Sequence, residues 1–135
     1  MGEIPKVVID TNIFVSGFGW EGKPKKILKL LEERKIKNFI RPAIIEEVKR
    51  AISYKRLRFP DDLQAEIIEF IYFYSKVVTP EEKLEVIKED PADNKFLECA
   101  VESKAKYIIS GNSHLLKLRT FRRIEILTPN DFLSR

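Results

Sequence analysis

The stretch PKVVIDTNIFVSGF, residues 5–18, decides the fold class because a short β-branched apolar run ends directly on a carboxylate. Residues 6–9 (KVVI) predict a strand that is buried on both faces, as in the middle of a parallel sheet. Asp10 follows at the carboxyl end of this strand, and residues 12–16 predict a short helix. In open α/β sheets, ligands bind outside the carboxyl ends of the strands. Asp10 is therefore a candidate site residue, although it also suits the role of a helix N-cap.

Strands and helices are predicted to alternate along the rest of the chain. Apolar periodicity predicts helices over residues 24–35, 42–52, 61–74 and 90–103, with a helical turn or two at 112–118. Short apolar runs predict strands within residues 38–42, 105–110 and 123–129, a brief extended piece at 76–80 and a terminal turn at 130–134. This alternation implies crossover connections, and so a three-layer α/β/α fold with a central, mainly parallel sheet.

Length and composition indicate one soluble domain over residues 1–135, with 44% hydrophobic and 34% charged residues. The longest apolar stretch is interrupted by Glu69 and is too short to span a membrane. No extended apolar run precedes Asp10, so no secretory signal is expected. Cys99 is the single cysteine, which excludes an intrachain disulfide and suits the cytoplasm. The net charge of +4 modestly favours a polyanionic partner.

A second group of acids lies in EDPADNKFLECA, residues 89–100. Asp90 stands before a proline and suits the N-cap of the next helix, while Asp93 suits its first turn, where the helix dipole favours an anion. Helical spacing nevertheless places Asp93 on the same face as Phe96, which must be buried. A carboxylate in that position needs a cationic partner, and a metal ion is the natural one.

A third acid comes from PAIIEEVKRAI, residues 42–52. Glu46 points nearly opposite to the apolar stripe of this helix, whereas Glu47 lies on its flank between Ala43 and Ala51. Because these neighbours are small, Glu47 has room to lean into a cleft, and we prefer it over Glu46. The alternative is that Glu47 is exposed and pairs with a nearby basic residue.

The predicted strand at residues 105–110 runs into Ser-Gly-Asn, where Asn112 suits the N-cap of the next helix and can also offer an amide oxygen. The α/β fold could collect three acids and an amide at one edge of the sheet, and these predicted metal ligands are Asp10, Glu47, Asp93 and Asn112. Like charges this close repel unless a divalent cation neutralises them. Oxygen ligands suit Mg²⁺ or Mn²⁺ rather than zinc, and such sites hydrolyse phosphodiesters.

The sequence also resembles a known family. The segments VVIDTNIFVSGF, PAIIEEVKRAI, EDPADNKFLECAVESKAKYIISGNSHLL and EILTPNDFL resemble the PIN-domain ribonucleases, in particular the short toxins of toxin–antitoxin pairs, in the family's order over nearly the whole chain. The resemblance implies a single PIN-like domain with Mg²⁺- or Mn²⁺-dependent endoribonuclease activity on RNA. It also implies a homodimer and a small antitoxin protein as partner.

The resemblance further implies which residues form the site. By position, Asp10, Glu47 and Asp93 match the family's three catalytic acids, and Asp90 is an additional acid in the third motif. Thr11 and Ser110 match polar residues that line the site, and Asn12 adds a polar group at the same edge. The sequence departs from the family at Asn112, where members often carry an aspartate. An amide brings no negative charge, so affinity for a second ion should fall.

Basic residues gather in GKPKK, YKRLRF and KLRTFRR. The predicted contacts to RNA phosphates are Lys23, Arg56, Arg58, Arg119 and Arg122. Trp20 could stack on a base. The alternative is that these side chains are solvated charges and that the tryptophan covers its neighbours. We assign His114 to a helix surface and Cys99 to packing.

Two other functions are consistent with parts of the sequence. Asp10 could be the phosphoryl-accepting nucleophile of a phosphatase resembling the haloacid dehalogenases, but their Asp-x-Asp motif is interrupted here by Asn12. The more serious alternative is a PIN-like module that binds RNA or protein and whose catalysis is weakened by Asn112. Metal-dependent cleavage separates the nuclease from the binding module.

Overall fold

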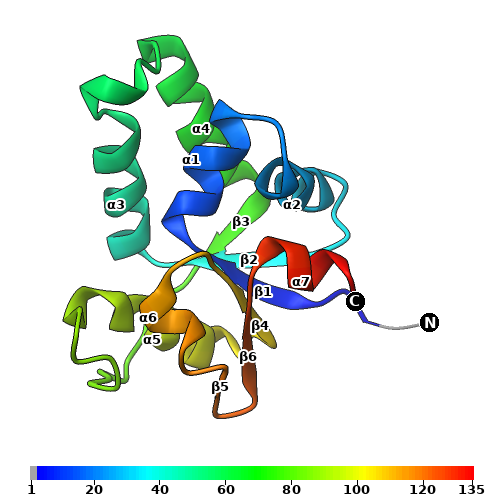
Figure 1. The fold of residues 1–135 in the computed structure, drawn as a ribbon, viewed down its shortest axis with the longest axis vertical. Coiled ribbons are helices and arrows are strands. Elements are labelled where there is room, and N and C mark those ends of the chain that lie inside the picture. Colours follow the sequence, from blue (N-terminus) through cyan, green and yellow to red (C-terminus); the bar gives the residue numbers. More distant parts are fainter. Residues whose placement is uncertain (1–2) are drawn as a thin grey trace.

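A six-stranded sheet runs through the middle of the computed structural model, which describes residues 3–135 (Figure 1). The strand order is β3-β2-β1-β4-β6-β5, and all neighbours are parallel except β5 and β6. The strands are β1 (Lys6–Ile9), β2 (Lys37–Ile40), β3 (Ser75–Val77), β4 (Tyr107–Ile109), β5 (Thr120–Phe121) and β6 (Ile124–Leu127). The predicted, mainly parallel sheet is therefore confirmed.

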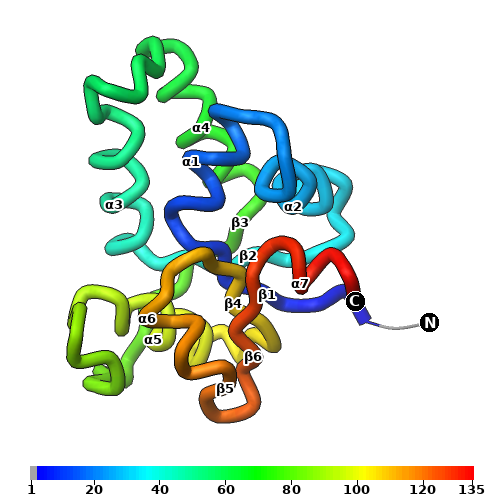
Figure 2. Tube along the Cα trace, in the orientation of Figure 1, coloured from blue at the N-terminus to red at the C-terminus, as the bar shows by residue number. Residues whose placement is uncertain are grey.

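Helices cover both faces of this sheet, as the alternating pattern predicted. They are α1 (Thr11–Gly19), α2 (Lys23–Glu32), α3 (Pro42–Ile52), α4 (Asp61–Tyr74), α5 (Asn94–Ser103), α6 (Ser113–Leu116) and α7 (Pro129–Leu133), with the 3₁₀ turns η1 (Lys55–Leu57) and η2 (Pro91–Asp93). The helices α1, α2 and α7 group on one side, whereas α5 packs against β1, β2 and β4 from the other (Figures 1 and 2). The result is the expected three-layer α/β/α architecture.

The first strand occupies the centre of the sheet because all of its inner residues are apolar and β-branched. Val7, Val8 and Ile9 are fully buried. The register pairs Ile9 with Ile109 in β4, so the carboxyl ends of β1 and β4 lie side by side. The residues that follow these two strands are Asp10 and Ser110, and the register alone brings them together.

A buried asparagine fixes the other side of β1. Asn38 is 2% exposed, and its Oδ1 accepts a hydrogen bond from the Ile9 amide at 2.9 Å. Its Nδ2 donates to Ser75 Oγ at 2.9 Å, which ties β2 to β3 as well. A buried amide is stable only when its polar atoms are bonded. This side chain therefore helps to hold the end of β1, and hence Asp10, in place.

Several local expectations need correction. Helix α1 extends to Gly19 rather than ending at residue 16, and residues 129–133 form a short helix instead of a turn. Aspartate is a favoured cap residue, so the sequence predicts Asp61 or Asp62 as the N-cap of α4. This prediction is wrong, because Pro60 holds the N-cap position and both acids lie in the first turn. Strand β5 was not expected, since two residues carry no periodic signal.

Two further expectations concern the packing of Cys99 and the absence of membrane-spanning helices. Cys99 is fully buried in α5, in keeping with a packing residue, and burial raises the pKa of its thiol to about 12. Across the described residues 3–135, the helices are all too short or too polar to cross a membrane.

Candidate active site

Asp10 lies at the carboxyl end of β1 and is held there by β4. Its backbone amide donates to Ile109 O at 3.0 Å, and Ser110 Oγ donates to Asp10 Oδ2 at 2.6 Å. Asp10 occupies the N-cap position of α1, but its carboxylate makes no capping hydrogen bond. The capping interpretation is therefore wrong for the side chain, which turns toward Ser110 instead.

The environment of Asp10 disfavours its charge. The residue is 3% exposed, and burial is the largest influence, raising the pKa of the carboxyl group from its ordinary 3.8 to about 6. The Ser110 hydrogen bond opposes this rise, whereas the negative charges of Glu47 and Asp93 add to it. A buried carboxylate among acids is a common property of functional sites, because it favours a cationic ligand.

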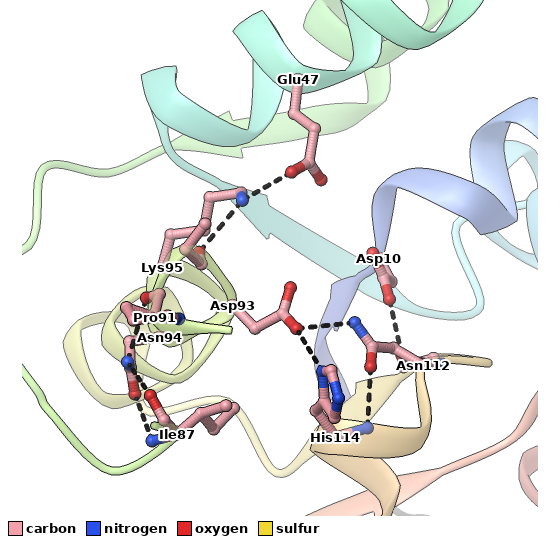
Figure 3. Close-up of polar contacts among 11 residues, drawn as sticks. Asp10, Glu47, Ile87, Pro91, Asp93, Asn94, Lys95, Asn112 and His114 are labelled. Atoms are coloured by element: carbon pink, nitrogen blue, oxygen red, sulfur yellow. Dashed lines mark hydrogen bonds and ion pairs between the residues drawn. The ribbon is translucent and has the colours of Figure 1, made fainter. Parts of the chain in front are cut away.

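Glu47 reaches this edge of the sheet from α3. Thr11, which follows Asp10 and is buried, donates a hydrogen bond from Oγ1 to Glu47 Oε1. Lys95 at the start of α5 places its Nζ 2.6 Å from Glu47 Oε2 and also donates to Ala92 O at 3.0 Å (Figure 3). The neighbouring Glu46 is exposed, and its Oε1 lies 3.4 Å from Lys49 Nζ on the same helix. The structure thus turns Glu47, and not Glu46, toward the other acids.

Asp93 ends the 3₁₀ turn η2, immediately before α5, and is 5% exposed. The turn explains why α5 begins at Asn94 and why Asp90, the expected cap, makes no capping bond. Asn112 Nδ2 donates to Asp93 Oδ2 at 2.9 Å. Figure 3 shows the carboxyl groups of Asp10, Glu47 and Asp93 facing a common space.

Asn112 caps α6 as expected, because its Oδ1 accepts from the His114 amide at 2.8 Å. The backbone N–H of Asn112 donates to Ser110 Oγ at 2.9 Å. The side chain therefore presents its NH₂ group, and not its oxygen, to Asp93. Ligation of an ion by the amide oxygen would require this side chain to turn and the cap to break.

The assignment of His114 to a helix surface is wrong. Its side chain is 33% exposed, and Nδ1 lies 3.5 Å from Asp93 Oδ2, which is too long for a good hydrogen bond. Nδ1 is enclosed and has no hydrogen-bond partner among the described residues. One ligand atom from each of Asp90, Asp93 and His114 falls within 4.8 Å of the others.

The donor set of this site fits a divalent cation. Asp10 and Asp93 are buried acids that approach from two elements, and Glu47 adds a third carboxylate. Each carboxylate has one oxygen held by a neutral donor: Ser110 binds Asp10, Thr11 binds Glu47, and Asn112 binds Asp93. Donors that orient ligating carboxylates in this way are typical of metal sites.

Other predicted residues lie elsewhere. Asn12 is exposed at the start of α1, close enough to Glu47 to line the same surface hollow. The predicted RNA-binding residues are spread over separate elements: Lys23 begins α2, Arg56 lies in η1, Arg58 follows it, and Arg119 and Arg122 flank β5. Arg122 forms a bidentate pair with Glu82 at 2.7 and 2.8 Å. Trp20 is 55% exposed and leans on Phe59 with ring centroids 6.2 Å apart.

Two residues of the site were missed from the sequence. Lys95 carries no local signal, because its partner Glu47 comes from a different helix. For His114 a signal existed, since it is the single histidine and stands two residues after Asn112.

Comparison with known proteins identifies the family. Residues 6–114 match the PIN-domain family. The chain is 34% identical over 141 residues to the uncharacterized protein MJ1680 of Methanocaldococcus jannaschii. The alignment covers 96% of this chain and 90% of that protein. A chain of the Rickettsia felis VapBC2 crystal structure, bound to a DNA fragment from their promoter, superposes with a TM-score of 0.61 at 12% identity, over 90% of this chain and 96% of that chain.

The structural match shows that the fold is shared, and the sequence match covers the strands and helices that carry Asp10, Glu47 and Asp93. PIN domains are generally nucleases, and their acidic sites typically use divalent metals. The cluster of acids at the carboxyl edge of this sheet is therefore in keeping with the match, and the chain belongs to the PIN-domain family.

Proposed function

We propose that this chain is a Mg²⁺- or Mn²⁺-dependent endoribonuclease that hydrolyses RNA phosphodiester bonds. The observation that carries the proposal is the convergence of Asp10, Glu47 and Asp93 from three elements onto one space at the carboxyl edge of the sheet. Membership of the PIN-domain family supports it. That membership also disfavours the phosphatase alternative, which requires an aspartate where Asn12 stands.

We further propose that the protein is the toxin of a toxin–antitoxin pair, with a small antitoxin as partner and a homodimer as its own assembly, in the cytoplasm. The support is the structural likeness to a chain of VapBC2, whose crystal structure also contains DNA from the promoter. The test of this part is co-expression with the neighbouring small gene product, followed by copurification and measurement of growth. If the chain neither copurifies with that product nor slows growth when expressed alone, it is not a toxin of this kind.

In the proposed mechanism, Asp10, Glu47 and Asp93 hold the metal, which when bound supplies Lewis acidity toward the phosphoryl group and toward a water molecule. Ser110, Thr11 and Asn112 orient these carboxylates by binding one oxygen of each, which leaves the second oxygens of Asp10 and Asp93 free for ligation. No rearrangement of those two carboxylates is then needed when the substrate arrives.

Lys95 adds a positive charge to the same site. Its ammonium contacts the remaining oxygen of Glu47 and is largely shielded from solvent, with 11% of the side chain exposed. This ion pair offsets part of the repulsion among the acids in the metal-free protein. If Glu47 were to hold a metal, the Lys95 ammonium would be available to bind a non-bridging oxygen of the RNA phosphate.

The experiment is cleavage of single-stranded RNA in Mg²⁺ or Mn²⁺ by wild type, Asp93→Asn and Asn112→Asp, with EDTA as one control. Asp61→Asn is the matched control, because Asp61 is an exposed acid in the first turn of α4. We expect wild type and Asp61→Asn to cut RNA only with metal, and Asp93→Asn to lose activity by about 100-fold or more. Equal activity of wild type and Asp93→Asn would refute the assignment of the site.

One observation favours a second candidate function. Asn112 donates its amide to Asp93, so the site carries one negative charge fewer than an aspartate at this position would provide. A PIN-like module that binds RNA or protein with weakened catalysis would show this feature. If wild type does not cleave RNA while Asn112→Asp does, the binding module is the correct description. If neither wild type nor any variant cleaves RNA, the nuclease proposal is refuted for this substrate.

A further inference from the structure

A cleft opens beside the acids, between α3, the start of α5 and the loop at residues 83–88. Its volume is about 790 Å³, and Arg41, Arg50 and Lys95 contribute to its walls. A second hollow of about 480 Å³ along α3 contains Glu47 and Tyr54, and the two hollows share Arg50. We call these two adjoining hollows the path along α3; it runs beside Glu47, because Lys95 of the first hollow contacts Glu47 of the second.

The charge of the first hollow is predominantly positive. Five cationic side chains line it, namely Arg41, Arg50, Lys83, Lys88 and Lys95, against the two acids Glu85 and Glu98. Arg41 pairs with Glu98, and Lys95 pairs with Glu47. Within residues 3–135, the remaining three cations make no ion pair at 4.0 Å or less. Their charges are therefore available to a ligand.

Two more features mark this path as a binding surface. Arg41 lines the first hollow, and its Nε is buried without a hydrogen-bond partner in the described part of the chain. Tyr54 lines the second hollow and is 57% exposed. Unpaired cations followed by an exposed aromatic ring are the usual features of a surface that binds single-stranded nucleic acid.

We propose that this path along α3 binds the RNA strand, with Lys83 and Lys88 of the first hollow and the shared Arg50 contacting phosphates, while Tyr54 of the second hollow stacks on a base. The inference rests on the proposed ribonuclease function and specifies how the substrate lies. It assigns the phosphate contacts to residues other than the basic segments singled out in the sequence. It therefore places no phosphate contact at Lys23, Arg119 or Arg122, which line neither hollow.

The test measures binding apart from cleavage. A short fluorescein-labelled single-stranded RNA is titrated with protein in EDTA, and fluorescence anisotropy is followed at several salt concentrations. The variant Lys83→Gln/Lys88→Gln removes two exposed charges of the cleft, and Lys26→Gln/Lys29→Gln removes two exposed charges of α2 as the matched control. We expect the cleft variant to bind about tenfold more weakly and to lose about 1.4 from the slope of log K against log salt concentration, at about 0.7 per phosphate contact.

A second pair of variants tests the stacking contact. Tyr54→Ala is expected to weaken binding about tenfold without changing the salt dependence, because stacking releases no counterions. Tyr72→Ala is the matched control, since Tyr72 is 53% exposed on α4, outside the path. The cleft variant should change both the affinity and the slope of log K against log salt concentration, whereas Tyr54→Ala should change the affinity alone. This difference would separate phosphate contacts from stacking.

The outcomes distinguish this inference from the function on which it rests. If the cleft variant and the α2 variant bind RNA equally, the inference is wrong, even if wild type cuts RNA with Mn²⁺. If wild type binds RNA through the cleft but never cuts it, the inference stands and the nuclease function fails. Loss of antitoxin binding by the cleft variant, with RNA binding intact, would also overturn the inference and assign the cleft to a protein partner.

Discussion

Replacing Asp10 by asparagine is expected to stabilise the metal-free protein near neutral pH. Asp10 is buried, and its pKa lies at about 6 rather than at the ordinary 3.8. Each pH unit of difference corresponds to about 1.4 kcal/mol, so keeping this carboxylate charged costs the fold ~3 kcal/mol. Asparagine removes the charge, but it accepts a weaker hydrogen bond from Ser110. The weaker bond lowers the free energy of unfolding by about 1 kcal/mol. We therefore expect a net gain of about 2 kcal/mol.

The sign of this effect depends on pH. The folded state holds the Asp10 proton more tightly than the unfolded state, because its pKa is raised. Below pH 3.8 the carboxyl group is neutral in both states, so charge makes no difference between wild type and Asp10→Asn. As pH rises from 3.8 through about 6, wild type loses stability relative to the variant, and above that value the full difference is present.

Urea unfolding followed by circular dichroism in EDTA measures this difference at about pH 4 and about pH 7.5. Asp131→Asn is the control, because Asp131 is exposed in α7. Mn²⁺ should then stabilise wild type more than Asp10→Asn, since the carboxylate is a proposed ligand. The reasoning is refuted if Asp10→Asn is less stable than wild type near neutral pH in EDTA, or if the difference does not change with pH.

Three further substitutions test other parts of the structure. Ser110→Ala should weaken Mn²⁺ binding about tenfold in isothermal titration calorimetry, because Asp10 loses its orienting hydroxyl group; unchanged affinity would contradict this. Lys95→Gln should tighten Mn²⁺ binding about fivefold, since Glu47 loses the competing ammonium; weaker binding would show that Lys95 supports the site instead. Ile71→Ala should lower the free energy of unfolding by about 2–5 kcal/mol in urea, because Ile71 is fully buried in α4; a change below about 1 kcal/mol would contradict the packing described.

The layers of the fold could be predicted because the strands and helices differ in period and length. Residues 7–9 of the first strand are all apolar and buried, as expected of a central parallel strand, and this strand does lie in the middle of the sheet. The 3₁₀ turn before α5 and the two-residue strand β5 could not be predicted. Elements this short are determined by tertiary contacts, and they leave too few residues for a periodic signal.

The candidate site was predictable only in part, for a similar reason. Asp10 and Asn112 stand at strand ends, so their place follows from the chain order and the rule for parallel sheets. Lys95 contacts Glu47, and His114 lies near Asp93, through side-chain directions that depend on how α5 and α6 pack on the sheet. The cationic cleft was missed because Arg50 and Lys88 are far apart in the sequence and form no basic segment.

The contact between Ser110 and Asp10 joins residues that are 100 positions apart, and this separation has a consequence during translation. The central strand β1 is made long before its neighbour β4 and before Ser110 and Asn112, which bind Asp10 and Asp93. Contacts of such long range form late in folding. A nascent chain can therefore carry Asp10 and Glu47 before Asp93, Ser110 and Asn112 exist, and the proposed activity can begin only after these later residues have been made.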